Sequence, residues 1–110
     1  IQRVARRKGE MGIGDSAYRA AQEFMKMTEA MEGVDTMAFS AGIGENSARM
    51  RADIVDRLSW FGIKIDAEKN AARSSEIRDI SAADSKVRVL IVPTDEEYMI
   101  ALDVKELLGK

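Results

Sequence analysis

Two short segments of this 110-residue chain combine residue types and a spacing that could do chemistry. The first is the run Gly42-Ile43-Gly44-Glu45-Asn46, and the second is the run Pro93-Thr94-Asp95-Glu96-Glu97. Backbone without side chains can approach a ligand closely, which glycine permits. Neighbouring carboxylates can hold a divalent cation. We therefore treat both runs as candidate binding segments.

The glycine-bearing run follows an apolar stretch and precedes an expected helix. Gly42 and Gly44 leave the backbone accessible, and the first N–H groups of a helix have no partner within it. A phosphate or a flat base could lie against such backbone. Two glycines one residue apart are not a dinucleotide fingerprint, because a third glycine is lacking. A tight turn with glycine at positive φ is the alternative explanation, and the spacing leaves both open.

The acidic run follows the strongest expected strand. Ligands in open α/β sheets collect at the carboxyl ends of strands, so both runs could face one crevice. The carboxylates of Asp95, Glu96 and Glu97 could hold Mg²⁺ directly or through water. The alternative is helix capping, because Thr94 with Glu97 matches a capping box and acidic residues suit the first turn of a helix. The residues alone leave this choice open as well.

Composition limits the remaining chemistry. The chain has no Cys and no His, so thiolate or imidazole ligands and a histidine general base are excluded within it. Its formal net charge is -2 with both signs mixed, so we expect no nucleic-acid partner. No apolar run is long enough to span a bilayer and no signal peptide is visible, so we expect no membrane association and a cytoplasmic location.

Helices and strands alternate in the hydrophobic pattern. We expect helices over residues 16–31, 46–60 and 95–108, separated by strands over residues 36–40, 63–66, 77–81 and 87–92. The first helix carries an apolar stripe of Tyr18, Ala21, Phe24, Met25 and Met31. Gly33 and Gly62 are expected to end the first and second helices. This order predicts one α/β domain over residues 1–110 with parallel strands at its centre.

Both candidate runs resemble motifs of one known family. Residues 39–46, Phe-Ser-Ala-Gly-Ile-Gly-Glu-Asn, resemble the nucleotide motif of acetate, propionate and butyrate kinases, and residues 93–97 resemble their carboxy-terminal motif. Residues 61–66 and Asn70 lie between the motifs and are similar to the family's strand and following turn. The resemblance begins near Gly33. It implies a partial lobe of the ribonuclease-H-like fold of the actin-like ATPase superfamily, and a carboxy-terminal, nucleotide-side domain that is a fragment of a larger kinase.

The resemblance also implies roles for particular residues. Gly42, Ile43, Gly44, Glu45 and Asn46 would line the adenine and ribose end of an ATP site, and Glu96 would be the carboxylate associated with Mg²⁺. Asp95 stands where many members of the family have Asn. The family transfers the γ-phosphoryl group of ATP to a short-chain carboxylate, giving an acyl phosphate. The arginine, histidine and aspartate that surround the reacting phosphoryl group lie upstream in the family, so we expect no catalytic residue in this chain.

Other functions remain compatible with the sequence. The family pairs subunits through its carboxy-terminal domains, which implies a homodimer formed through this domain. A non-catalytic α/β domain that serves subunit contact or nucleotide binding only is therefore an alternative to a kinase part. An unrelated α/β binding module with two capped helices is a third interpretation, which the presence of both motifs disfavours. The sequence does not separate acetate, propionate and butyrate as the substrate.

Overall fold

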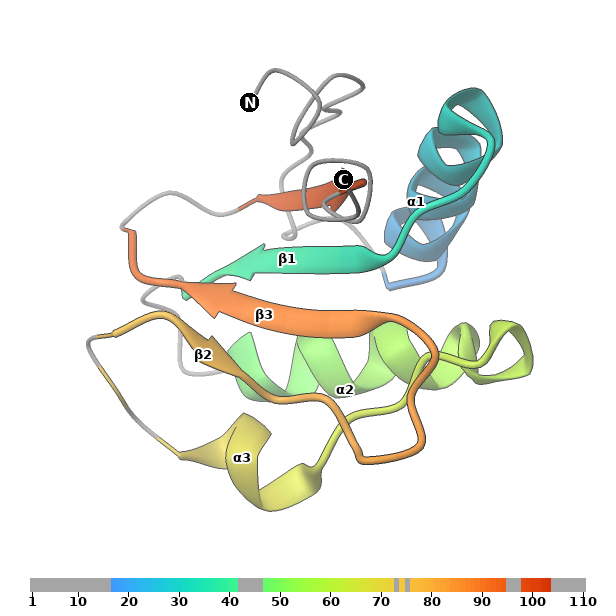
Figure 1. The fold of residues 1–110 in the computed structure, drawn as a ribbon. Helices are drawn as coiled ribbons and strands as arrows, with labels where there is room; N and C mark the ends of the chain where they lie inside the picture. The colour runs from blue at the N-terminus through green and yellow to red at the C-terminus, as the bar shows by residue number, and fades with distance from the viewer. Residues whose placement is uncertain (1–16, 42–46, 73, 75, 95–97, 104–110) are drawn as a thin grey trace, which may run out of the picture.

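The chain forms a four-stranded mixed sheet with helices packed against it (Figure 1). The computed structural model describes residues 17–41, 47–72, 74, 76–94 and 98–103, and the structural statements below concern these. The strand order is β2-β3-β1-β4. Its strands are β1 (Thr36–Ser40), β2 (Arg78–Asp79), β3 (Arg88–Val92) and β4 (Met99–Leu102). The central pair β1 and β3 is parallel, as predicted, and each outer strand is antiparallel to its neighbour.

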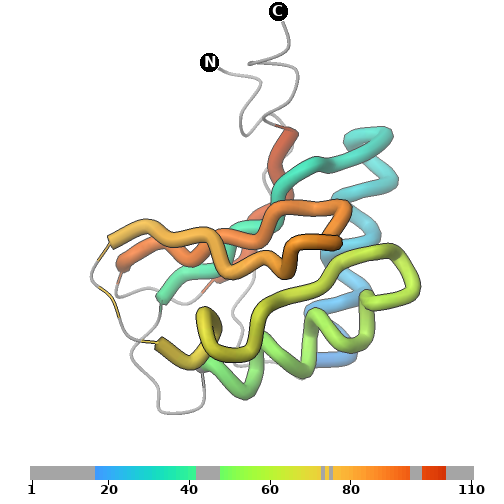
Figure 2. Tube along the Cα trace, turned by 60° about the horizontal axis from the view of Figure 1, so that its bottom comes forward, coloured from blue at the N-terminus to red at the C-terminus, as the bar shows by residue number. Residues whose placement is uncertain are grey.

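The helices lie together beside this sheet. They are α1 (Ala17–Met31), α2 (Ser47–Arg57) and the short α3 (Ala67–Ala71), with a 3₁₀ turn at Ser59–Phe61. Figure 2 shows α1 and α2 next to one another on one side of the strands, and the two helices are in contact. Helix α2 is part of the connection from β1 to its parallel neighbour β3, which also contains α3 and the outer strand β2.

Strand register decides which side chains meet the helices. Side chains of successive strand residues point to opposite faces, and paired residues point to the same face. The face turned to the helices is fully apolar on the three longer strands and carries Met37, Phe39, Val89, Ile91, Met99 and Ala101. Their partners in the core include Ala20 and Phe24 of α1 and Ile54 and Leu58 near the end of α2. The opposite face carries the half-buried Leu90, Val92, Ile100 and Leu102.

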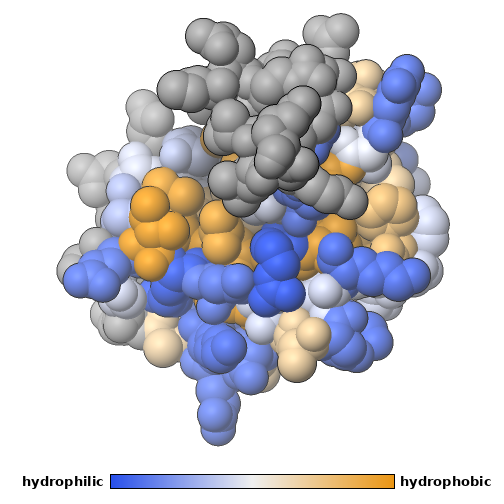
Figure 3. Space-filling model, in the orientation of Figure 1, coloured by the Kyte–Doolittle hydropathy of each residue, from blue (hydrophilic) through white to orange (hydrophobic). Residues whose placement is uncertain are grey.

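The surface mixes hydrophobic and hydrophilic side chains. In the orientation of Figure 1, hydrophobic areas form a band across the middle of the molecule that hydrophilic side chains interrupt (Figure 3). Three large hydrophobic residues among those described are exposed, namely Tyr18, Trp60 and Ile77. Tyr18 was expected in the apolar stripe of the first helix, and that prediction is wrong, because the side chain is 57% exposed. The buried face of α1 passes instead through Ala17, Ala20, Phe24, Thr28 and Met31.

The predicted helix end at Gly33 is confirmed, whereas Gly62 ends a 3₁₀ turn that follows α2 and not α2 itself. Gly33 has a φ of 129° and its N–H bonds to Thr28 O at 2.9 Å, directly after α1. Helix α2 stops at Arg57, three residues earlier than expected, and the 3₁₀ turn fills the difference. Gly62 closes that turn with a φ of 97°. This positive φ favours glycine here, whereas the Cβ of another residue would meet only the flexible side chain of Lys86, at 2.7 Å from its Cδ.

Two predicted elements are corrected by the structure. Residues 63–66 are not a strand, since only Ile65 forms a single bridge, to Ser81. The expected helix over residues 95–108 is also wrong where the structure describes it, because Met99–Leu102 is strand β4. This segment pairs with β1 along its whole length, from Phe39–Met99 to Thr36–Leu102. Tertiary pairing with a strand edge therefore overrides the capping signal at residues 94–97.

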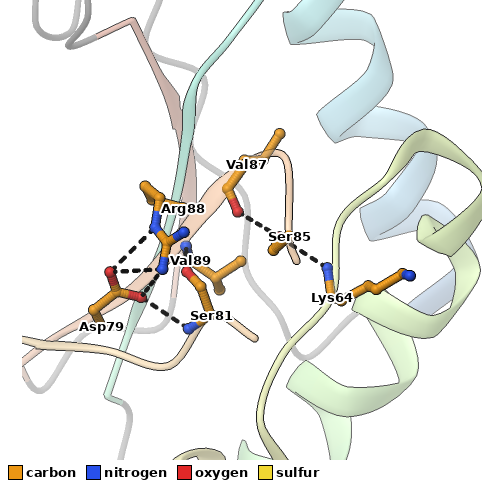
Figure 4. Close-up of polar contacts among 7 residues, drawn as sticks. All are labelled: Lys64, Asp79, Ser81, Ser85, Val87, Arg88 and Val89. Atoms are coloured by element: carbon orange, nitrogen blue, oxygen red, sulfur yellow. Dashed lines mark hydrogen bonds and ion pairs between the residues drawn. The ribbon is translucent and has the colours of Figure 1, made fainter. Parts of the chain in front are cut away.

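A polar cluster fastens β2 to the first half of β3 (Figure 4). The Oγ atom of Ser81 accepts a hydrogen bond from Val89 N at 2.6 Å, and the guanidinium of Arg88 lies 3.2 Å from the Asp79 carboxylate. Burial alone would raise the pKa of Asp79. Hydrogen bonds from Ser81 and the charge and hydrogen bond of Arg88 outweigh burial and hold that pKa below its usual value.

Candidate functional site

The carboxyl ends of the two central strands meet at one edge of the sheet. Ser40, the last residue of β1, pairs with Val92, the last residue of β3. The pairing continues one residue further, since Ala41 N donates to Val92 O at 2.7 Å. The arrowheads of β1 and β3 accordingly lie at the same side in Figure 1. The segments that follow these strands, 42–46 and 93–97, therefore start from neighbouring points.

Ser40 ties the second segment to the first. Its backbone N–H donates to Tyr98 O at 2.9 Å, and its Oγ accepts a hydrogen bond from Tyr98 N at 2.9 Å. The side chain is completely buried. Strands β3 and β4 lie on opposite sides of β1, so the segment that connects them must cross the end of β1. Thr94 and Tyr98 are the described residues at the two ends of this segment. One buried serine thus anchors the edge from which both candidate loops arise.

The residues predicted from the sequence to bind ligand lie outside the described residues. These are Gly42, Ile43, Gly44, Glu45 and Asn46 in the first loop and Asp95, Glu96 and Glu97 in the second. The structure describes the residues that flank them, and it ties Ala41 to Val92 and Tyr98 to Ser40 at this edge. That both loops face one crevice stays a prediction. Among the residues that the structure does describe, no group of three or more acidic side chains could hold a metal ion.

Sequence reasoning missed a buried arginine near this edge. Arg51 is 4% exposed, and it donates from Nε to Asn70 Oδ1 at 2.7 Å and from Nη2 to Asn70 O at 3.0 Å. Burial, together with the positive charge of Arg78, lowers the pKa of Arg51 to about 10. The helical spacing of the sequence could have predicted this burial, because Arg51 precedes Ile54 by three residues and so lies on the buried stripe of α2.

Asn70 also forms a hydrogen bond to the first turn of α2. It is 5% exposed, and its Nδ2 donates to Ala48 O at 2.9 Å. Helix α3, which carries Asn70, begins at Asp66, whose Oδ1 accepts hydrogen bonds from Glu68 N at 2.9 Å and Lys69 N at 3.0 Å. This N-cap fixes the short helix despite its length. Three hydrogen bonds therefore join α3 to α2 just after residues 42–46.

A second guanidinium lies beside Arg51. Arg78 pairs with Ile91 in the sheet, so its side chain points to the face that carries the helices. Its Nη2 donates to Ala72 O at 2.5 Å, while its buried Nε has no hydrogen-bond partner among the residues that the structure describes. Arg51 and Arg78 place two positive charges near the carboxyl edge of the sheet. Such a potential suits an anionic ligand.

One pocket in the described part of the chain lies elsewhere. Its volume is about 710 Å³, and it is lined by residues of α1 and of the end of α2, including Tyr18, Met25, Arg57 and Trp60. The guanidinium of Arg57 lies 5.8 Å from the centre of the Tyr18 ring. Since α2 begins at the candidate edge and ends at this pocket, the pocket is not part of the candidate site.

Within the described part of the chain, no helix has the length and apolar character needed to cross a membrane.

Comparison with known proteins agrees with the motifs. The model of the acetokinase family matches residues 5–102. The chain is 45% identical over 104 residues to the acetate kinase of Clostridium botulinum strain Langeland, which covers 94% of this chain and 26% of that protein. It is 61% identical over 77 residues to acetate kinase 1 of Latilactobacillus sakei, which covers 70% of this chain and 19% of that protein.

Solved structures of the same kind have this fold. The acetate kinase of Porphyromonas gingivalis matches with a TM-score of 0.62 and 32% identity, over 76% of this chain and 21% of that one. A propionate kinase from Francisella tularensis matches with a TM-score of 0.60 and 30% identity, over 77% of this chain and 21% of that one. The predicted α/β lobe of the actin-like ATPase type is therefore confirmed.

The fold and the edge from which the candidate loops arise define an α/β lobe of the actin-like ATPase type. More closely, the chain belongs to the acetokinase family. The match reaches from residue 5, well upstream of the expected start near Gly33. The chain spans about a quarter of the length of the Clostridium botulinum relative.

Proposed function

We propose that this chain supplies the nucleotide side, and the carboxy-terminal domain, of a kinase that transfers the γ-phosphoryl group of ATP to acetate or a similar short-chain carboxylate. The product is an acyl phosphate. One observation carries the proposal: the two family motifs arise from adjacent strand ends, which Ser40 joins through Tyr98. Two loops that are far apart in sequence thereby start at one point, as a shared nucleotide site requires.

The chain's own residues have separate roles in this proposal. Gly42 and Gly44 let the backbone of the first loop approach adenosine, with Ile43, Glu45 and Asn46 completing its wall. Glu96 would hold Mg²⁺ directly or through water. When bound, Mg²⁺ supplies charge neutralisation for the phosphoryl group. The guanidinium groups of Arg51 and Arg78 add positive potential behind the same edge.

Transfer itself needs residues that this chain lacks. The catalytic groups of the family lie upstream of the matched motifs, and we propose none within residues 1–110. The site must therefore be completed by a further part of the enzyme. This agrees with the quarter of the Clostridium botulinum acetate kinase that the chain covers.

A hybrid enzyme tests the proposed function. This chain would replace the matching segment of the Clostridium botulinum acetate kinase, and acyl phosphate would be trapped as its hydroxamate in the presence of ATP, Mg²⁺ and acetate. The hybrid should turn over and require both ATP and Mg²⁺, whereas the 110-residue chain alone should not. A folded hybrid without turnover would contradict the proposal, and turnover by the chain alone would contradict the assignment of the catalytic groups to another part.

Subunit contact is a second proposed role, favoured by one surface feature. Trp60 is 72% exposed and Tyr18 is 57% exposed, and both line the pocket between α1 and the end of α2. Exposed aromatic side chains beside a pocket are typical of protein interfaces. We propose that a second copy of this domain covers them in a cytoplasmic homodimer. Light scattering should show a dimer that Trp60→Ser weakens; an unchanged mass would refute this surface as the contact.

A further inference from the structure

Three hydrogen bonds, two of them buried and one partly buried, connect α3 to the start of α2. Arg51 makes two of them, to Asn70 Oδ1 at 2.7 Å and to Asn70 O at 3.0 Å. Asn70 makes the third, from Nδ2 to Ala48 O at 2.9 Å. Both side chains are at most 5% exposed. The planar guanidinium spans two acceptors of one residue, which fixes the orientation of both partners.

Burying the charge of Arg51 costs folding free energy, which packing alone does not explain. Arg51 occupies a buried position on the stripe that continues with Ile54 and Leu58. Its partner Asn70 is neutral, and its charged neighbour Arg78 is also positive. An apolar residue would fill such a position without desolvating a charge. A buried arginine whose hydrogen bonds within the described part of the chain go to a neutral residue therefore indicates that orientation matters here.

The bonds act at the exit of the first candidate loop. Ala48 is the second residue of α2, and Asn46 ends the loop only two positions earlier. The first N–H groups of a helix point toward ligands at its amino end, so their direction follows the direction of the first turn. A small rotation of Ala48 would redirect the N–H groups at the start of α2. Positioning of this kind affects ligand binding steeply.

We propose that Arg51 and Asn70 are positioning residues that hold the first turn of α2 in the orientation that favours nucleotide binding at its amino end. The inference rests on the proposed function and goes beyond the loop residues themselves. Neither side chain needs to touch ATP. Their effect should appear in the affinity for nucleotide, with little effect on the rate of transfer or on the carboxylate substrate.

Asn70→Asp separates this role from a merely structural one. Aspartate has nearly the same shape, and it keeps an acceptor for Arg51 with an opposite charge, which supports the buried guanidinium. It loses the donor to Ala48 O, and a carboxylate oxygen then faces a carbonyl oxygen. The unfolding midpoint of the chain should therefore change little. In the hybrid enzyme the KM for ATP should rise about three- to tenfold, as the loss of one hydrogen bond gives, with kcat and the KM for acetate nearly unchanged.

Two further variants complete the experiment. Arg51→Lys keeps the charge but replaces the fork that spans both acceptors of Asn70, so it should raise the KM for ATP in the same way. Asp53→Asn is the control, because it breaks an exposed pair on the same helix, 3.4 Å from Arg57, and should change nothing. An unchanged KM for ATP in Asn70→Asp would overturn the inference, as would equal rises in the KM values of ATP and acetate. An inactive wild-type hybrid would instead refute the proposed function itself.

Discussion

Ser40→Ala is the change that probes the candidate edge most sharply. It removes the Oγ that accepts a hydrogen bond from Tyr98 N at 2.9 Å and leaves the bond from Ser40 N to Tyr98 O in place. A donor that loses its partner in a buried setting costs about 1–3 kcal/mol, and Tyr98 is half-buried, so the lower half of this range applies. The unfolding midpoint should fall by about 4–8 °C for each kcal/mol lost.

Function should respond separately from stability. Tyr98 follows directly after the segment that contains Glu96, and Ser40→Ala removes one of its two anchors on β1. In the hybrid enzyme, the Mg²⁺ concentration that gives half of the maximal rate should rise about three- to tenfold, which corresponds to about 0.7–1.4 kcal/mol. Titration with Mg²⁺ at saturating ATP and acetate measures this directly.

Ser81→Ala is a matched control, because Ser81 follows β2 and bonds to Val89 in the first half of β3. The Oγ of Ser81 also accepts a buried backbone hydrogen bond, from Val89 N at 2.6 Å, and the residue is 1% exposed. Its removal should lower the midpoint by a similar amount without changing the requirement for Mg²⁺. If both variants shift the Mg²⁺ requirement equally, or if neither does, the reasoning that links Ser40 to the acidic loop is refuted.

Three further changes test other parts of the account. Gly44→Ala should weaken ATP binding more than it lowers the unfolding midpoint, whereas a positive-φ turn alone would cost about 1 kcal/mol or more of stability and leave the dissociation constant unchanged. Glu96→Gln in the hybrid should reduce turnover strongly, with partial recovery in excess Mg²⁺; an unaltered Mg²⁺ dependence would remove Glu96 from the metal site. Asp79 has a lowered pKa in the folded chain, so it stabilises the fold above its unfolded pKa near 3.8, and this contribution is lost as the pH falls through the folded pKa. The stability difference between wild type and Asp79→Asn, measured by urea unfolding, should therefore shrink below pH 4, and a constant difference would contradict the assignment.

The two central strands could be predicted from the length and apolar character of their sequences. Residues 36–40 and 87–92 are short runs rich in apolar residues between turn signals, and both appear as strands at the sheet centre. Because the two motifs directly follow these strands in the sequence, their position at the strand ends could be predicted as well. That these ends are neighbours follows from the parallel pairing of Ser40 with Val92, which the expected α/β topology already contained.

The end of the chain could not be predicted from local pattern. Met99-Ile100-Ala101-Leu102 is apolar throughout, so it fits the inner side of a helix as well as a strand. Thr94 and Glu97 made the helix seem favourable through their capping pattern. Residues 99–102 form a strand because the backbone groups along the second edge of β1 need hydrogen-bond partners, which Met99–Leu102 provides.

The burial of particular polar side chains could not be predicted from the sequence either. Arg51, Asn70 and Ser40 form the hydrogen bonds that hold the candidate edge, yet their residue types are usually exposed. Asn70 was noticed only as part of the family resemblance. Its contact with Ala48 joins residues 22 positions apart, and no local pattern encodes such a contact.

The most direct test of the nucleotide site is a titration of the ¹⁵N-labelled chain with ATP and Mg²⁺, followed by amide chemical shifts. The account predicts that the shifts concentrate at Ala41, Gly42, Gly44 and Asn46 and, when Mg²⁺ is added, extend to Glu96 and Tyr98. Amides that line the pocket between α1 and the end of α2, such as Met25 and Trp60, should stay unchanged. Shifts confined to that pocket, or no shifts at millimolar ATP, would contradict the claim that these two loops form a nucleotide site.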